Sequence, residues 1–161
     1  MKMPNTLHVV VRFSDRLFSI GNVIEKHNDV VSRFGYVWFG KIGMPVAQRR
    51  IDTLNEQIQK GIQTHLFLVQ GNRKQSNFYQ ANLLNISRAI LKSESKCHPD
   101  YYLDNNIKKN IQTWFKITKI NQIDSSVISK LRAIGSVYSL SETLVRSSTG
   151  YFLVQEGQNV Y

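Results

Sequence analysis

Residues 64–90, THLFLVQGNRKQSNFYQANLLNISRAI, decide the fold class. Thr64–Gln70 is an apolar run of strand length that is typical of the middle of a sheet. Gly71–Ser76 has the composition of a basic turn, and the loose alternation over Phe78–Ile90 favours a long strand over a helix. No helix separates these two strands, whereas the parallel crossovers of a doubly wound fold require one.

The residues before this stretch alternate between strands and helices. Apolar and aromatic runs predict strands at Leu7–Phe13 and Tyr36–Ile42, the second with Phe39 and Lys41 on one face and Trp38 on the other. Helical spacing of apolar residues predicts helices over Ile20–Phe34, with Ser19 able to cap its start and Gly35 near its end, and over Ala47–Lys60, stopped by Gly61.

The residues after it are mainly strands with short helices. We expect an irregular surface connection over Lys92–Asn110, strands at Gln112–Ile120 and Tyr151–Val154, and helices at Ser125–Ala133, capped by Ser125 or Ser126, and Leu140–Val145. The predicted fold is α+β: a curved mixed β-sheet or partly closed β-barrel with peripheral helices. A chain of 161 residues matches one domain, which we place over residues 1–161.

An excess of basic residues is the strongest functional signal. Lysine and arginine total 21 against 11 acidic residues, which gives a formal net charge of +10. Such a surface releases condensed counterions from DNA or RNA, although a solvated basic face is the alternative. The residues predicted to contact a nucleic-acid backbone are Arg12, Lys41, Arg49, Arg50, Arg73, Lys74, Lys108 and Lys109.

Motifs of catalysis and cofactor binding are absent from the sequence. It contains no G-x-G-x-x-G, no phosphate-binding loop and no G-x-S-x-G, its four histidines are scattered, and Cys97 is its single cysteine. We therefore predict no catalytic residue, no metal and no cofactor. One alternative stays open: a small nuclease or nucleotide hydrolase that uses His65 or His98 as acid or base.

Neither a membrane span nor a secretory signal is visible. No apolar run approaches the length that crosses a bilayer, and the start, MKMPNTLHVVVRF, lacks an apolar core with a small-residue cleavage site. We expect a cytoplasmic protein with no membrane partner.

Three short segments resemble the PUA-like superfamily, and specifically its EVE and YTH domains. They are RFSD at 12–15, GYVWFGKIG at 35–43 and SLSETLVRSSTGYFLVQEG at 139–157. The nearest similarity is to the EVE-like modules of modification-dependent restriction systems, over roughly Leu7–Gln155. This resemblance implies a concave pocket that takes a modified base, flipped out of a duplex or presented on a single strand.

The resemblance also implies roles for individual residues. Ser14 and Asp15 would read the edge of the base, Trp38 and Trp114 would be the aromatic walls, and Tyr79 a weaker wall. Core packing is the alternative for both tryptophans. In a restriction or defence role, either a separate nuclease or motor subunit would supply the cleavage, or these residues would be a module of a larger chain.

The leading hypothesis is thus a non-catalytic nucleic-acid-binding domain. A further alternative is a protein-interaction subunit of a defence system whose charge only keeps it soluble. Residues 125–145 also resemble a helix-turn-helix in which two short helices flank Gly135, with Arg132 and Arg146 as its contacts to nucleic acid.

Overall fold

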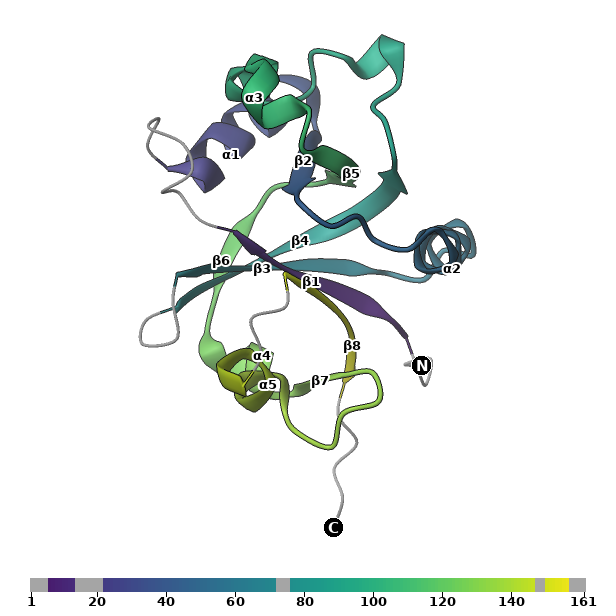
Figure 1. Ribbon diagram of the computed structural model, residues 1–161, viewed down its shortest axis with the longest axis vertical. Coiled ribbons are helices and arrows are strands. Elements are labelled where there is room, and N and C mark those ends of the chain that lie inside the picture. The colour runs from purple at the N-terminus through teal and green to yellow at the C-terminus, as the bar shows by residue number, and fades with distance from the viewer. Residues whose placement is uncertain (1–5, 14–21, 72–75, 147–149, 157–161) are drawn as a thin grey trace.

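The strands form one mixed, curved sheet with helices on both faces (Figure 1). The computed structural model describes residues 6–13, 22–71, 76–146 and 150–156. Within these, the strand order is β2-β5-β4-β3-β1-β8-β7, with β6 beside β4, and the sheet is not closed into a barrel. The strands are β1 His8–Phe13, β2 Val37–Ile42, β3 His65–Gly71, β4 Ser76–Ser87, β5 Ile111–Ile117, β6 Asn121–Ile123, β7 Leu131–Ala133 and β8 Tyr151–Glu156.

The bend of the sheet lies in β4. The first part of this strand pairs antiparallel with β3, and its last part pairs with β5. Between them the register with β5 shifts from Leu83 opposite Ile117 to Asn85 opposite Lys116, which leaves Leu84 as an extra residue. A bulge of this kind bends the strand and increases its twist, so it turns the β5–β2 pair away from the plane of β3 and β1.

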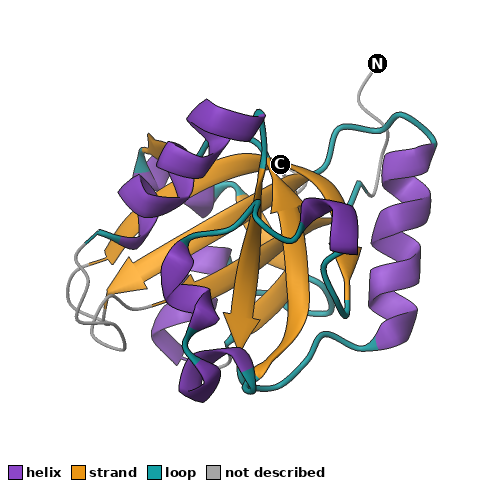
Figure 2. Cartoon of the chain, turned by 90° about the horizontal axis from the view of Figure 1, so that it is seen from above, coloured by secondary structure: helices purple, strands orange, loops and turns teal. Residues whose placement is uncertain are grey.

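Alternation along the central strands separates two apolar cores. Val9 and Val11 of β1 pack with Leu66 and Leu68 of β3 on one face, which α1 and α2 cover. On the opposite face of the sheet, Val10 of β1 and Phe67 of β3 pack with residues of α4 and α5. The helices are α1 Val23–Phe34, α2 Gln48–Gln59, α3 Asn105–Lys108, α4 Ser125–Ser129 and α5 Leu140–Arg146 (Figure 2).

A third apolar cluster holds the aromatic outer face of β2 and β5. Trp38 and Trp114 pack there against Cys97 and Tyr102, which belong to the connection between β4 and β5. The expectation of an irregular surface connection over Lys92–Asn110 is therefore wrong. Two 3₁₀ helices, η2 Lys92–Glu94 and η3 Asp100–Leu103, lie in it together with α3, and Tyr102 is 2 % exposed.

The ends of two helices differ from the prediction. Helix α1 begins at Val23, where the Asn22 side chain accepts from the amides of Ile24 and Glu25, so Asn22 is its cap rather than Ser19. Gly35 ends this helix as predicted, at φ 84°, in the left-handed region that favours glycine. Asp124, not Ser125 or Ser126, caps α4.

The segment after α4 is a strand, which corrects two further expectations. The helix predicted over Ser125–Ala133 stops at Ser129, and Leu131–Ala133 pairs with β8 as β7. Since a strand separates α4 from α5, residues 125–145 do not form a helix-turn-helix. The sequence also gave no sign of β6, which follows β5 and pairs with β4.

Candidate functional site

A pocket of about 120 Å³ lies where the ends of β1 and β2 approach the start of α1 and η3. We call it the β1–β2 pocket. Four aromatic and two cationic side chains belong to its lining, together with small and aliphatic residues. The lining residues are Val11, Arg12, Phe13, Val23, Phe39, Gly40, Lys41, Ile42, Tyr101 and Tyr102. The pocket thus combines flat apolar surfaces with positive charge.

A buried chain of hydrogen bonds forms the rear of this pocket. The amide of Gly40 donates to the hydroxyl of Tyr102 at 3.0 Å, and this hydroxyl lies 3.0 Å from Nε2 of His27. Nδ1 of His27 lies 2.7 Å from the carbonyl oxygen of Val23, which can only accept. His27 therefore carries its proton on Nδ1, and Tyr102 donates to Nε2. The Gly40 amide, the Tyr102 hydroxyl and both ring nitrogens of His27 thus each have a hydrogen-bond partner.

Burial keeps His27 neutral. Desolvation lowers the pKa of His27 to about 4, against the opposing effect of the hydrogen bond to Val23. Desolvation and the nearby His65 likewise lower the pKa of His8 to about 4. A neutral imidazole is what the hydrogen-bond chain requires, because Nε2 must accept from Tyr102.

These histidines give the protein a predictable loss of stability in mild acid. Below about pH 6.5 the unfolded chain binds protons that the folded chain does not accept until about pH 4, so the free energy of unfolding falls as the pH is lowered through this window. Each histidine contributes about 1.4 kcal/mol per pH unit at most. Urea unfolding at pH 7, 6 and 5 measures the slope, which His8→Asn should reduce. A flat profile would contradict the neutral assignment.

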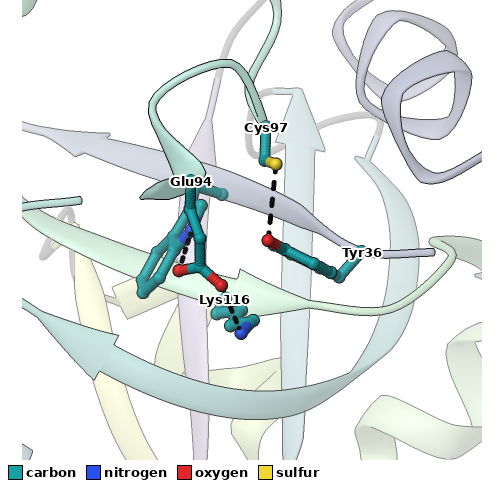
Figure 3. Close-up of polar contacts among 5 residues, drawn as sticks. Tyr36, Glu94, Cys97 and Lys116 are labelled. Carbon is teal, nitrogen blue, oxygen red and sulfur yellow. Dashed lines mark hydrogen bonds and ion pairs between the residues drawn. The ribbon is translucent and has the colours of Figure 1, made fainter. Parts of the chain in front are cut away.

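A polar cluster anchors the connection that carries η3 (Figure 3). The carboxylate of Glu94 accepts from Lys116 Nζ at 2.7 Å and from the indole of Trp38 at 3.2 Å. The Cys97 thiol donates to the Tyr36 hydroxyl at 3.4 Å, and the Cys97 carbonyl accepts from the Trp38 amide. Partial burial raises the pKa of Glu94, but the bonds from Lys116 and its neighbours outweigh it and lower the pKa below its usual range. These contacts attach the connection to β2 and β5.

Gly40 keeps β2 close to the aromatic cluster. A Cβ atom at this position would lie 2.8 Å from Cδ1 of Ile111 and 2.9 Å from Cζ3 of Trp114. Neither neighbour can retreat easily, since both are buried in the third cluster. A larger residue at position 40 would push β2 or Trp114 out of place. The absence of a side chain at Gly40 and the hydrogen bond from its amide to Tyr102 thus both position β2 at the wall of the pocket.

Lys41 and Arg50 lie beside the ring of Tyr151 at the start of β8, and Arg12 belongs to the neighbouring strand β1; we call these three residues the basic rim. Lys41 Nζ lies 5.3 Å and the Arg50 guanidinium 5.9 Å from the Tyr151 ring centroid. Arg12 pairs through its amide with the Gly150 carbonyl and through its guanidinium with the Leu144 carbonyl at 2.6 Å. Lys41 is 5 % exposed and donates to the Met44 carbonyl, and burial lowers its pKa.

The structure brings together only part of the residues predicted for the site. Arg12 and Lys41 line the β1–β2 pocket, and Arg50 lies beside them at the start of α2. Arg49 is exposed on α2, and Lys108 and Lys109 are exposed at the end of α3. Ser14, Asp15, Arg73 and Lys74 lie outside the described residues.

The predicted aromatic walls lie near the pocket but do not line it. Trp38 and Trp114 are 1 % and 5 % exposed in the third cluster. The Trp114 ring lies 5.0 Å from the Tyr102 ring, so it supports a residue that does line the pocket. Tyr79 packs beside Phe13, with their centroids 6.1 Å apart, and its hydroxyl donates to Gln70.

The aromatic residues of the pocket itself were not singled out from the sequence. Phe13 is the last residue of a predicted strand. Phe39 lies on the same face of β2 as Lys41, and this alternation was the one sequence signal that could have identified Phe39 as a lining residue. Tyr101 and Tyr102 gave no signal, because they sit in a polar stretch after Pro99. His27 looked like one residue of an amphipathic helix.

The histidines of the alternative enzymatic hypothesis lie outside the pocket. The His65 ring on β3 lies 5.1 Å from the His8 ring on β1 at a tilted angle, and its Nδ1 lies 3.2 Å from Nε2 of Gln80 on β4. His98 stacks on Trp114 at 6.0 Å and donates from Nδ1 to the Pro99 carbonyl. The part of the chain that the structure describes holds no group of three or more His, Cys, Asp or Glu residues arranged for a metal. In the same part, no helix has the length and apolar character to cross a membrane.

Comparison with known proteins gives one match. A family model described as Pua-like matches residues 9–153, which is most of the chain and includes every lining residue of the pocket. No curated protein and no solved structure matches the chain.

Proposed function

Since the chain belongs to the Pua-like family, whose domains commonly bind RNA or DNA, we propose that it binds nucleic acid by taking one base into the β1–β2 pocket. The observation that carries this proposal is the composition of the lining, in which aromatic rings and two cations meet in one pocket. A nucleotide has the same two parts, a flat base and a charged phosphate. The pocket offers a complement to each of them.

The aromatic lining gives a base its binding energy. Stacking of one base on an aromatic side chain contributes about 1 to 3 kcal/mol, and it tolerates any base because every base has a π-face. Phe13 is the half-buried phenyl ring of the lining, at the end of β1. We assign the stacking role to Phe13 and Tyr101 instead of Trp38 and Trp114, which support the wall from behind. A base stacked inside a duplex does not reach such a pocket, so the target is single-stranded or extruded.

The basic rim gives the phosphates a place to bind. Arg12 and Lys41 are lining residues of the pocket, and Arg50 extends the positive charge over Tyr151. Burial of Lys41 disfavours its charged form, and a bound phosphate would offset that cost. The remaining positive charge of the chain, +10 in all, adds affinity that falls with salt.

Finer assignments follow from the sequence resemblance and are part of the proposal. An EVE-like or YTH-like role would make the bound base a modified one, with Ser14 and Asp15 at its edge. A defence role would require a separate nuclease or motor subunit. The cytoplasmic location is likewise a prediction from the sequence.

Removing the Phe13 ring tests the proposal. Phe13→Ala is expected to weaken binding of a fluorescent single-stranded oligonucleotide by about tenfold or more, because the base loses its stacking partner. Fluorescence anisotropy measures the affinity, and thermal melting confirms that the variant is folded. Phe13→Tyr keeps a ring and should bind like the unmodified chain. Phe34→Ala is the matched control, since Phe34 is an exposed phenyl at the end of α1 outside the pocket. Unchanged binding by folded Phe13→Ala would refute the proposed site.

A further inference from the structure

A nucleic-acid strand that places one base in the β1–β2 pocket continues over the protein surface on at least one side of that base. We infer that it continues along β8, from Tyr151 to Arg132 of the edge strand β7, and that Arg132 binds one of its phosphates. This inference rests on the proposed function and adds the path of the strand to it. The register of β7 and β8, the state of the Arg132 side chain and the positions of nearby carboxylates carry it.

Tyr151 and Arg132 lie on the same face of the sheet. Tyr151 pairs with Val11 of β1, which belongs to the core on the side of α1 and α2. Side chains two residues apart along a strand share a face, so Gln155 of β8 is on this side as well. Arg132 is the partner of Gln155 on β7, and side chains directly opposite each other on paired strands share a face. The path therefore begins beside the basic rim and ends at Arg132.

The distance along β8 suits a short stretch of nucleic acid. Four residue steps separate Tyr151 from Gln155, and at about 3.3 Å for each step they span about 13 Å. A stacked single strand advances about 3.4 Å per nucleotide, so about four nucleotides cover this distance, and fewer do if the strand is extended. Strand β7 is the edge of the sheet in the described part of the chain, so a bound strand leaves the protein beyond Arg132.

The Arg132 side chain has an unused hydrogen-bond donor. Among the described residues, its Nε atom is buried and has no acceptor for its hydrogen. Buried polar groups normally have a partner, so this arginine lacks an acceptor that a ligand could supply. Arginine binds phosphate through two parallel N–H bonds, one of which comes from Nε in a common geometry. The side chain as a whole is only half-buried, so a change of rotamer brings Nε to a strand that lies on β8.

The carboxylates of β8 and α2 are engaged elsewhere. Glu156 points to the opposite face of β8, where desolvation lowers the pKa of His8 and His65 and the charge of Glu156 opposes that shift. On α2, Asp52 and Glu56 each contact a side chain of the same helix or its end. Within the described residues these three carboxylates thus have other partners, and the charge of Arg132 is available for a phosphate.

Oligonucleotides of graded length test the path. Each carries one base-bearing nucleotide, followed on its 5′ side or on its 3′ side by one, three or six abasic sugar-phosphate units, and competition anisotropy gives its affinity. We expect Arg132→Gln to bind the shortest strands like the unmodified chain. It should bind the longest strand of one polarity about tenfold more weakly, because that strand loses a charged hydrogen bond to its phosphate.

Gln155→Glu tests the same contact without changing Arg132. A carboxylate opposite Arg132 would pair with its guanidinium and repel a phosphate, so the same long strand should again bind about tenfold more weakly. Gln122→Glu makes the same charge change at an exposed residue of β6 and should leave every affinity unchanged. Arg33→Gln is the matched control for Arg132→Gln, since Arg33 is exposed on α1, at the other end of the molecule from β7 (Figure 1). Thermal melting shows which variants are folded, and Gln155→Glu decides alone if Arg132→Gln is not.

The outcomes separate this inference from the proposed function. If folded Arg132→Gln and Gln155→Glu bind strands of every length like the unmodified chain, while Phe13→Ala weakens them all, the path is wrong and base binding in the pocket stands. An equal loss for the shortest and the longest strands in Arg132→Gln would also overturn the path. Unchanged binding of the shortest strands by folded Phe13→Ala would overturn the pocket, and with it the starting point of the path.

Discussion

Replacing Arg12 by glutamine and Lys41 by methionine in one chain is expected to weaken single-strand binding by about a hundredfold at low salt. Each charged hydrogen bond to a phosphate contributes about 1.5 kcal/mol or more, which is roughly tenfold in affinity. Loss of two phosphate contacts should also reduce the slope of log affinity against log salt by about 1.4, because each contact on a single strand contributes about 0.7. Anisotropy titrations at several salt concentrations measure both quantities.

The salt dependence of the affinity, compared with that of a control variant, distinguishes binding at the basic rim from binding to any positive surface. Lys60→Met with Lys130→Met is the control pair, since both lysines are exposed and neither lines the pocket. It removes the same charge, and we expect little change in either quantity. Equal losses in the two double variants would show that binding follows net charge and not the pocket. Because Arg12 also bonds the Leu144 carbonyl, thermal melting must show that the Arg12→Gln, Lys41→Met variant is folded.

Removing one hydroxyl from the rear wall should have the largest effect on stability. Tyr102→Phe leaves the Gly40 amide without its acceptor and His27 Nε2 without its donor, both in a buried environment. An unsatisfied buried polar group costs about 1 to 3 kcal/mol, so we expect a loss of about 3 kcal/mol in the free energy of unfolding. For a chain of this size that lowers the melting temperature by roughly 10 °C.

Tyr138→Phe is the control for this substitution. It removes the same hydroxyl from a tyrosine that is 41 % exposed, and we expect almost no change in stability. Chemical denaturation of both variants gives the comparison. Equal stability of Tyr102→Phe and the unmodified chain would mean that the Tyr102 hydroxyl does not hold the rear wall of the pocket.

The regular strands were predictable because apolar and β-branched residues form runs of strand length. Val9–Val11 and Leu66–Val69 are such runs, and β2 shows the predicted alternation, with Phe39 in the core that α1 covers and Trp38 in the third cluster. The long strand after Gly71 was predicted for the same reason, and it excluded a doubly wound sheet. The match of the Pua-like family over residues 9–153 confirms the resemblance seen in the sequence at the level of the superfamily.

The pocket was not predictable, because distant contacts build it. Tyr102 meets Gly40 across 62 positions of sequence and His27 across 75, and no local pattern records either contact. Strand β7 has three residues and depends on β8 for its pairing, so helix-favouring neighbours concealed it. Aromatic character marked the two tryptophans in the sequence, but their burial in the third cluster could not be read from it.

Photochemical cross-linking tests the central claim, base binding in the β1–β2 pocket, most directly. A single strand that carries one 5-iodouridine is bound, irradiated and digested with trypsin, and the modified peptide is identified by mass spectrometry. The lining aromatics fall on peptides 13–16, 34–41 and 97–108, whereas Tyr138 falls on peptide 133–146. We predict cross-links on the first three peptides that an excess of the same strand without iodine suppresses. Cross-links confined to peptide 133–146, or to other parts of the surface, would contradict the account.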